Sequence, residues 1–263
     1  MVKPLPFSPS YNAADPLTRM NGLQWRLPGA PLRISVAAAA GAGLVAVAGL
    51  AMTVGPVLHT GSGYTLRSMV IFAVIMLAAA GVAGRLHPFP RFGPANWVTT
   101  MRVMLVALVA GALFEPVTPI AAWLVVGATI VLTALDGLDG WLARRMRIAS
   151  RFGAWFDMET DALLILVLSV FVWRYGKAGA WVMACGLMRY AFVASGWILP
   201  WMAGPLRPTF RGKTVAVGQY LGLGLALAPV VRTPISDVTA AVTLVALAWS
   251  FAIDVGRLRR KEG

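Results

Sequence analysis

Charge is scarce in this chain: of its 263 residues only 13% are charged, whereas 59% are hydrophobic. A soluble domain averages about 25% charged and about 45–50% apolar residues. The shortage of charge therefore argues against an ordinary soluble domain and predicts a protein that lies in a lipid bilayer. With a single cysteine, Cys185, the chain has neither an internal disulfide framework nor a thiolate metal site.

Acidic residues are the rarer sign, ten against 23 basic ones, which gives a formal net charge of +13. A balance this basic raises the question of nucleic acid. The basic residues stand in short clusters between apolar runs, however, a pattern typical of membrane topology. We therefore expect a lipid bilayer as a partner and no nucleic acid. Residues 1–33 are polar and contain several prolines, without the charged start and apolar core of a signal peptide.

Eight apolar runs are each long enough, at roughly 17–25 residues, to cross the hydrocarbon layer as a helix. The sequence therefore predicts an all-α, polytopic membrane helix bundle. The predicted spans are Ile34–Val54, Ser68–Gly84, Trp97–Phe114, Ile120–Ala143, Phe152–Trp173, Ala178–Ala203, Thr214–Val231 and Ala240–Val255.

The basic residues also predict the orientation of these spans. With residues 1–33 placed in the cytoplasm, seventeen lysines and arginines fall on the cytoplasmic side and four on the other. Loops on the cytoplasmic side of a membrane protein carry such an excess. We therefore expect both termini in the cytoplasm and a location in a bacterial inner membrane.

Five of the ten acidic residues lie within 26 residues, at adjoining ends of the fourth and fifth predicted spans. Asp136 and Asp139 are three residues apart, and Asp157 and Asp161 are four apart, so that each pair shares a helical face. Glu159 lies two residues from both members of the second pair and points elsewhere. Ionisable residues within membrane helices are costly and by default suggest function.

The short basic loop between these spans, 144–151, makes the two helices antiparallel neighbours whose aspartates can converge. Four such carboxylates cannot all be ionised unless positive charge is supplied. Ligands that are all oxygen suit hard cations such as Mg²⁺ or Mn²⁺. The alternative is a set of exposed aspartates paired with nearby arginines, which does not explain the register on both helices.

Small residues accompany the aspartates. Gly140 and Ala143 lie on or beside the face of Asp139, and Gly153 begins the opposite stripe. Residues this small allow a flat group to approach the backbone, although each can equally serve helix packing. Arg144, at the end of the stripe, is either a phosphate clamp or a topology anchor.

These residues together resemble the signature of the CDP-alcohol phosphatidyltransferases. Two further segments are similar to that family: one opens the third predicted span, and the other contains Gly212, Lys213 and Gln219, with Ala216 where the family has threonine. The matching motifs are Asp136-x2-Asp139-Gly140-x2-Ala143-Arg144-x8-Gly153-x3-Asp157-x3-Asp161 and Asn96-x2-Thr99-x2-Arg102.

The resemblance implies transfer of a substituted phosphate from a CDP-linked donor, such as CDP-diacylglycerol, to a small alcohol, with release of CMP in phospholipid synthesis. It implies two divalent ions, Mg²⁺ or Mn²⁺, held by Asp136, Asp139 and Asp157. Asp161 would lie near a metal and act as the general base. The implied CDP pocket comprises Asn96, Thr99, Gly140, Ala143, Arg144 and Gly153.

The resemblance also implies a division of the chain and a homodimer. A six-helix core would occupy 91–256, preceded by a cytoplasmic segment at 1–33 and two accessory helices at 34–90. A basic cytoplasmic tail, 257–263, would follow the core.

Four basic residues are candidates for binding an anionic acceptor such as sn-glycerol 3-phosphate: Arg189, Arg207, Arg211 and Lys213. Arg189 is the most informative of them, because it lies within a predicted span, whereas the others also suit topology anchoring. Serine or another alcohol is an alternative acceptor, and a soluble CDP-aminoalcohol with diacylglycerol as acceptor is an alternative donor and acceptor pair. An alternative hypothesis for the class of protein is a non-enzymatic membrane protein that binds or transports divalent cations.

Overall fold

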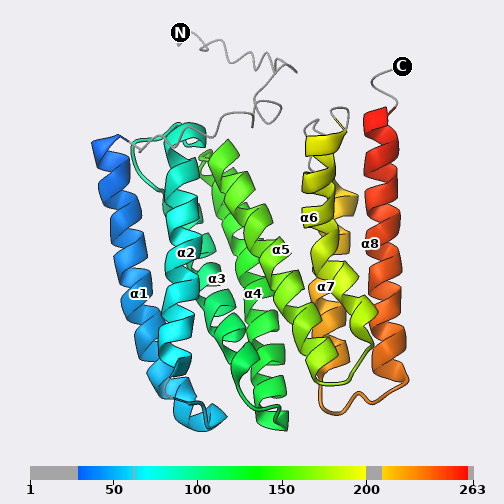
Figure 1. Cartoon of the computed structure of the whole chain (residues 1–263). Coiled ribbons are helices and arrows are strands. Elements are labelled where there is room, and N and C mark those ends of the chain that lie inside the picture. Colours follow the sequence, from blue (N-terminus) through cyan, green and yellow to red (C-terminus); the bar gives the residue numbers. More distant parts are fainter. Residues whose placement is uncertain (1–28, 62, 200–208, 260–263) are drawn as a thin grey trace.

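The computed structural model describes residues 29–61, 63–199 and 209–259, and within these ranges it contains helices and no strand. Figure 1 shows them side by side along one axis. The elements, in chain order, are α1 (Ala30–Leu58), α2 (Gly63–Leu86), α3 (Pro94–Gly111), η1 (Ala112–Phe114), α4 (Pro119–Arg145), α5 (Arg151–Arg174), η2 (Ala180–Val182), α6 (Met183–Ile198), α7 (Phe210–Leu227) and α8 (Ile235–Arg259).

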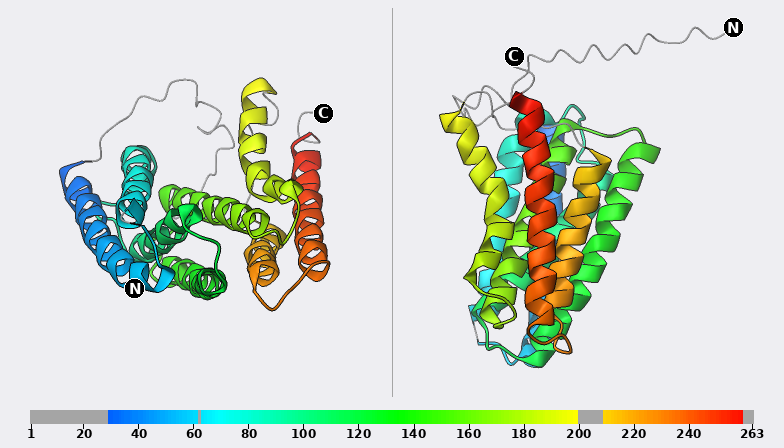
Figure 2. Two further views of the ribbon diagram at one scale, coloured as in Figure 1. Left: turned by 60° about the horizontal axis from the view of Figure 1, so that its bottom comes forward. Right: turned by 90° about the vertical axis from the view of Figure 1, so that its right-hand side faces the viewer.

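Successive helices run in opposite directions, so one end of the bundle collects the end of α4 and the start of α5 (Figure 1). We call this the aspartate end and the opposite one the far end. Helix α3 lies among α1, α2, α4 and α5, while α5 also contacts α6 and α7. Helix α7 packs beside α8, and the left view of Figure 2 places both on the other side of α5 from α1 and α2. The prediction of an all-α bundle is confirmed.

Five of these helices are long and apolar enough to cross a membrane: α1, α2, α3 with η1, α4 and α8. Their outer faces are apolar, as at Val45, where 75% of the residue is exposed, and at Val245, where 68% is exposed. Exposed apolar surface on this scale suits contact with lipid. The chain is therefore a multi-pass membrane protein. Helix α5 falls outside the five because every stretch of it long enough to cross the membrane contains more than two charged residues.

Two helices end earlier than the sequence predicts, and both ends precede a proline. The span predicted as Ala178–Ala203 begins with the short helix η2, and its α-helix ends at Ile198, after which Leu199 is extended and precedes Pro200. Likewise α7 ends at Leu227, because Ala228 precedes Pro229 and has a ψ of 132°. A residue before proline avoids the helical conformation for steric reasons.

The two N-terminal helices pack closely against each other, and a polar contact at the far end joins α2 to the rest of the bundle. A methyl group at Gly43 of α1 would lie 2.2 Å from the ring of Phe72 in α2, so this crossing needs a glycine. Beyond η1, the buried Glu115 forms an ion pair with Arg67 of α2 and accepts from the backbone N–H of Gly61 at 3.0 Å. These contacts fix α2 against the helices that carry the aspartates.

The starts of α3 and α5 are set by local signals at the aspartate end. Gly93 has a φ of 79°, which a glycine adopts without strain, and it is followed by a proline in the first turn of α3. The side chain of Ser150 accepts from the N–H of Gly153 at 2.9 Å and so caps α5. Phe92 and Phe152 pack together beside these two starts, with their ring centroids 5.8 Å apart.

Candidate metal and nucleotide site

Helix α4 carries the first pair of aspartates at the aspartate end. Asp136 and Asp139 are both buried, and they lie on the face that α4 turns toward α3 and α7. The hydroxyl of Thr99 in α3 donates to Asp139 Oδ2 at 3.0 Å. The predicted three-residue spacing thus places two carboxylates on one buried helical face.

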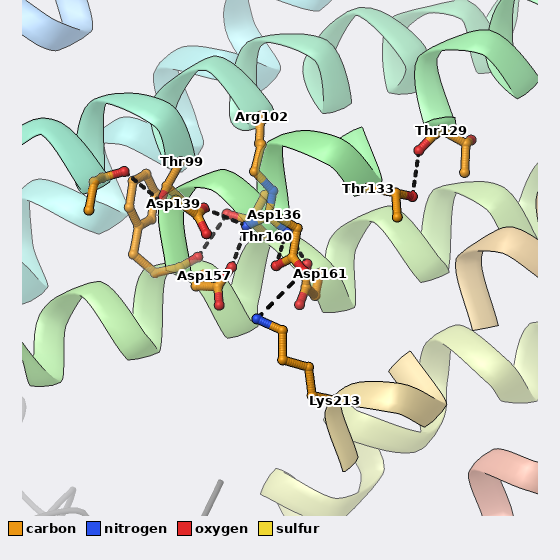
Figure 3. A network of polar contacts seen from close by, with 12 residues as sticks. Thr99, Arg102, Thr129, Thr133, Asp136, Asp139, Asp157, Thr160, Asp161 and Lys213 are labelled. Carbon is orange, nitrogen blue, oxygen red and sulfur yellow. Dashed lines mark hydrogen bonds and ion pairs between the residues drawn. The ribbon is translucent and has the colours of Figure 1, made fainter. Parts of the chain in front are cut away.

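Helix α5 brings the second pair to the same place. One oxygen each from Asp136, Asp139 and Asp157 lies within 4.8 Å of the others, and Asp161 contacts the same arginine as these three (Figure 3). The side chains of Asp157 and Asp161 are 31% and 19% exposed, whereas that of Asp136 is 4% exposed. The four carboxylates therefore form one cluster, with the α5 pair at its open side.

Arg102 of α3 lies at the centre of this cluster (Figure 3). Its side chain is 1% exposed, and its guanidinium forms ion pairs with all four aspartates. From the sequence, Arg102 is predicted only as part of a motif, without a role in the site. The available signal was its position within an apolar span, where a charge needs a partner.

The predicted nucleotide-pocket residues of α3 and α5 lie against one another. A methyl group at Gly153 would lie 3.2 Å from Asn96 Oδ1 and 3.3 Å from Ser150 Oγ. Asn96 is buried, and its amide group donates to the carbonyl oxygen of Phe92. The missing side chain at Gly153 thus leaves room for Asn96 beside the aspartate cluster.

A second group of small and basic residues lies where α4 ends. A methyl group at Gly140 would lie 3.2 Å from Arg144 Nη1 and 3.4 Å from Lys213 Nζ, so both cations flank this glycine. Lys213 also lies 3.7 Å from Asp136 Oδ2. Ala143 is half-buried one residue before Arg144, and its carbonyl oxygen accepts from Ile148 N at 3.1 Å. Two cationic side chains from different helices thus meet over a glycine.

The other basic residues predicted for the acceptor have different surroundings. Arg189 of α6 forms an ion pair with Glu159 of α5, and Arg211 of α7 pairs with Asp254 of α8 at 2.5 Å. Each pair joins neighbouring helices. Of the four predicted residues, the structure brings Lys213 to the aspartate cluster, while Arg207 lies outside the described residues.

The chemistry of the cluster fits divalent cations. All its ligand atoms are carboxylate oxygens, which suit a hard cation such as Mg²⁺ or Mn²⁺. Three of these oxygens come from two antiparallel helices and are close enough together to share an ion. Asp136, Asp139 and Asp157 are therefore able to hold a divalent cation.

Comparison with known proteins decides the family. Residues 92–253 match the family model of the CDP-alcohol phosphatidyltransferases. The chain belongs to this family. As a CDP-alcohol phosphatidyltransferase it is an enzyme that transfers phosphate-containing groups, as its signature predicted. The match starts just before α3 and ends within α8, so α1 and α2 lie outside it.

Two bacterial relatives of this phosphatidyltransferase are each named CDP-diacylglycerol–glycerol-3-phosphate 3-phosphatidyltransferase. The protein from Pseudomonas fluorescens is 30% identical over 145 residues, which cover 53% of this chain and 72% of the relative. The protein from Escherichia coli K12 is 34% identical over 84 residues, 31% of this chain and 44% of the relative. No solved structure matches the chain significantly.

Proposed function

We propose that this enzyme transfers a phosphatidyl group from CDP-diacylglycerol to sn-glycerol 3-phosphate and releases CMP. The names of two relatives support this donor and this acceptor. An acceptor that carries a phosphate needs positive charge near the reacting atoms, and Lys213 supplies it beside Asp136. The proposal depends above all on one observation, the convergence of carboxylates from α4 and α5 at one end of the bundle.

In this proposal Asp136, Asp139 and Asp157 hold two divalent ions, Mg²⁺ or Mn²⁺. Bound there, such ions would supply positive charge for the diphosphate of the donor and for the charge that develops on the departing phosphate. Lys213 and Arg144, which meet over Gly140, add fixed positive charge for the same phosphates.

Asp161 is the proposed general base. It takes the proton of the acceptor hydroxyl as that oxygen bonds to the phosphorus, and the bond between the phosphorus and the CMP oxygen breaks. Its position on the open side of the cluster, which it shares with Asp157, supports this role, because its side chain is 19% exposed while that of Asp139 is 5% exposed. A base must reach the hydroxyl that it deprotonates.

The proposed nucleotide pocket lies along the starts of α3 and α5. Asn96 and Gly153 adjoin there, and the hydroxyl of Thr99 orients Asp139. The absence of a side chain at Gly153 and at Gly140 leaves room beside the helix backbone for Asn96 and for the two cationic side chains, which in this proposal contact the nucleotide and its phosphates. Ala143 extends this surface toward Arg144.

A test of the reaction uses the purified full chain with CDP-diacylglycerol and a panel of alcohols, with CMP release as the readout. We expect CMP release in the presence of sn-glycerol 3-phosphate, and far less with serine, inositol or no acceptor. Faster release with another alcohol would replace the acceptor, and turnover only with a soluble CDP-aminoalcohol and diacylglycerol would replace the donor. Divalent-cation flux in liposomes without CMP release would refute the enzymatic proposal.

We further propose that the aspartate end faces the cytoplasm of a bacterial inner membrane, because most of the basic residues that the structure describes lie at that end. The single cysteine makes this testable in a Cys185→Ser background. Met146, at the aspartate end, is 51% exposed, and Val117, at the far end, is 50% exposed. A membrane-impermeant maleimide applied to intact cells should label Val117→Cys and leave Met146→Cys unlabelled; the reverse pattern would invert the orientation.

A further inference from the structure

The planar fork of Arg102 joins α4 to α5 in a symmetric way. Its Nη1 lies 2.8 Å from Asp139 Oδ2 on α4 and also contacts Asp157 on α5. Its Nη2 lies 3.3 Å from Asp136 Oδ1 on α4 and also contacts Asp161 on α5. Each terminal nitrogen therefore bridges one carboxylate from each helix.

This arrangement depends on the shape of the side chain as well as on its charge. A guanidinium presents its donors in a rigid plane, whereas a lysine ammonium offers one nitrogen on a flexible stem. Arg102 is held in place by burial, since it is 1% exposed and comes from α3, the helix between α2 and α4. It is thus a fixed cation rather than a mobile surface group.

The charges in the cluster do not balance. One arginine faces four carboxylates, and a further cation, Lys213, is half-exposed and lies 3.7 Å from Asp136. Carboxylates this close repel one another unless cations compensate them. Arg102 and the divalent ions therefore act on the same negative charge.

We propose that Arg102 is a positioning residue that serves as the resident cation of the aspartate site, holding the carboxylates of α4 and α5 together whether or not a divalent ion is bound. This rests on the proposed function in one respect, that the aspartates hold divalent ions. The contributions of Arg102 and of the divalent ions to stability should therefore be coupled. Without Arg102 only the divalent ions would offset the repulsion among the four carboxylates, so the stability of the protein would depend on these ions more strongly.

The test measures the melting temperature of the purified full chain in detergent, in EDTA and in Mg²⁺ or Mn²⁺, for the wild type and for Arg102→Gln. We expect the increase in Tm caused by the divalent ion to be at least twofold larger in Arg102→Gln, with the main loss of stability in EDTA. A matched control is Arg67→Gln, which removes the arginine ion pair at the far end. It should lower the Tm equally in both buffers.

An equal loss of Tm in both buffers for Arg102→Gln, as in the control, would make Arg102 an ordinary structural ion pair and overturn the inference. If Arg102→Gln does not fold, Arg102→Lys decides, because its single nitrogen cannot form both bridges. In Arg102→Lys the rise in Tm caused by the divalent ion should be larger than in the wild type but smaller than in Arg102→Gln. A rise identical to that of the wild type would contradict the inference. If divalent ions change neither the Tm nor the CMP release of the wild type, the proposed function would be refuted instead.

Discussion

The two ends of the bundle each contain a buried carboxylate paired with arginine, and the contrast between them is instructive. At the far end one glutamate, Glu115, meets one arginine, Arg67, which is 35% exposed. At the aspartate end one arginine, Arg102, meets four aspartates and is almost completely buried. The first pair compensates its own charge and ties α2 to the core. The second group retains an excess of negative charge, which additional cations can compensate.

The largest expected effect comes from the proposed base at the aspartate end. Asp161→Asn removes a proton acceptor, and general base catalysis contributes about 10²- to 10⁴-fold to a rate. We expect CMP release to fall by that factor while the protein still folds, as judged by gel filtration and Tm.

The matched control for this change is Glu159→Gln, the same chemical substitution two residues away on α5. Glu159 pairs with Arg189 of α6 and has no role in the proposed reaction. Its variant should keep CMP release near the wild-type rate. Near-normal activity in Asp161→Asn would refute the base assignment.

A smaller effect is expected at the proposed nucleotide pocket. Gly153→Ala places a methyl group 3.2 Å from Asn96 Oδ1, which must move to make room. We expect the KM for CDP-diacylglycerol to rise about tenfold, the equivalent of about 1.4 kcal/mol in binding, with a smaller change in kcat.

A glycine on α4 provides the comparison for that pocket variant. A methyl group at Gly137 would meet nothing within 4 Å, although this residue directly follows Asp136. Gly137→Ala should therefore leave the KM unchanged. An equal rise in KM for both variants would mean that the effect of Gly153→Ala is not a local one.

The smallest effect on turnover is expected at the far end. Glu115→Gln weakens the contact with Arg67 and should lower the free energy of unfolding by about 1–3 kcal/mol, the cost of disturbing a buried polar partner. The rate of CMP release per folded molecule should stay at the wild-type level, measured at a temperature below the Tm of both proteins. A loss of kcat in Glu115→Gln would show that the two ends are coupled.

The cluster of four aspartates was predictable from the sequence for two reasons. Spacings of three and four residues place each pair on one face of its helix, and the short loop makes the two helices antiparallel neighbours. The sequence did not predict the place of Arg102, whose partners lie between 34 and 59 residues further along the chain. Their convergence depends on how α3 packs between its neighbours. The same holds for Arg189, whose partner Glu159 is on another helix.

The helices themselves were largely predictable from their apolar length, since each predicted span falls on an observed helix. The residues at which the helices end were less predictable. The sixth and seventh spans were extended across Pro200 and Pro229, although the residue before each proline leaves the helical conformation. Hydropathy alone carries no information about that local steric effect.

The most direct test of the central claim is the dependence of CMP release on divalent cations, measured with the purified wild-type chain, CDP-diacylglycerol and sn-glycerol 3-phosphate. If the excess negative charge at the aspartate end exists to hold such ions, release should be absent in EDTA and should return in proportion to site occupancy as Mg²⁺ or Mn²⁺ is added. Release at the same rate in EDTA would contradict the account.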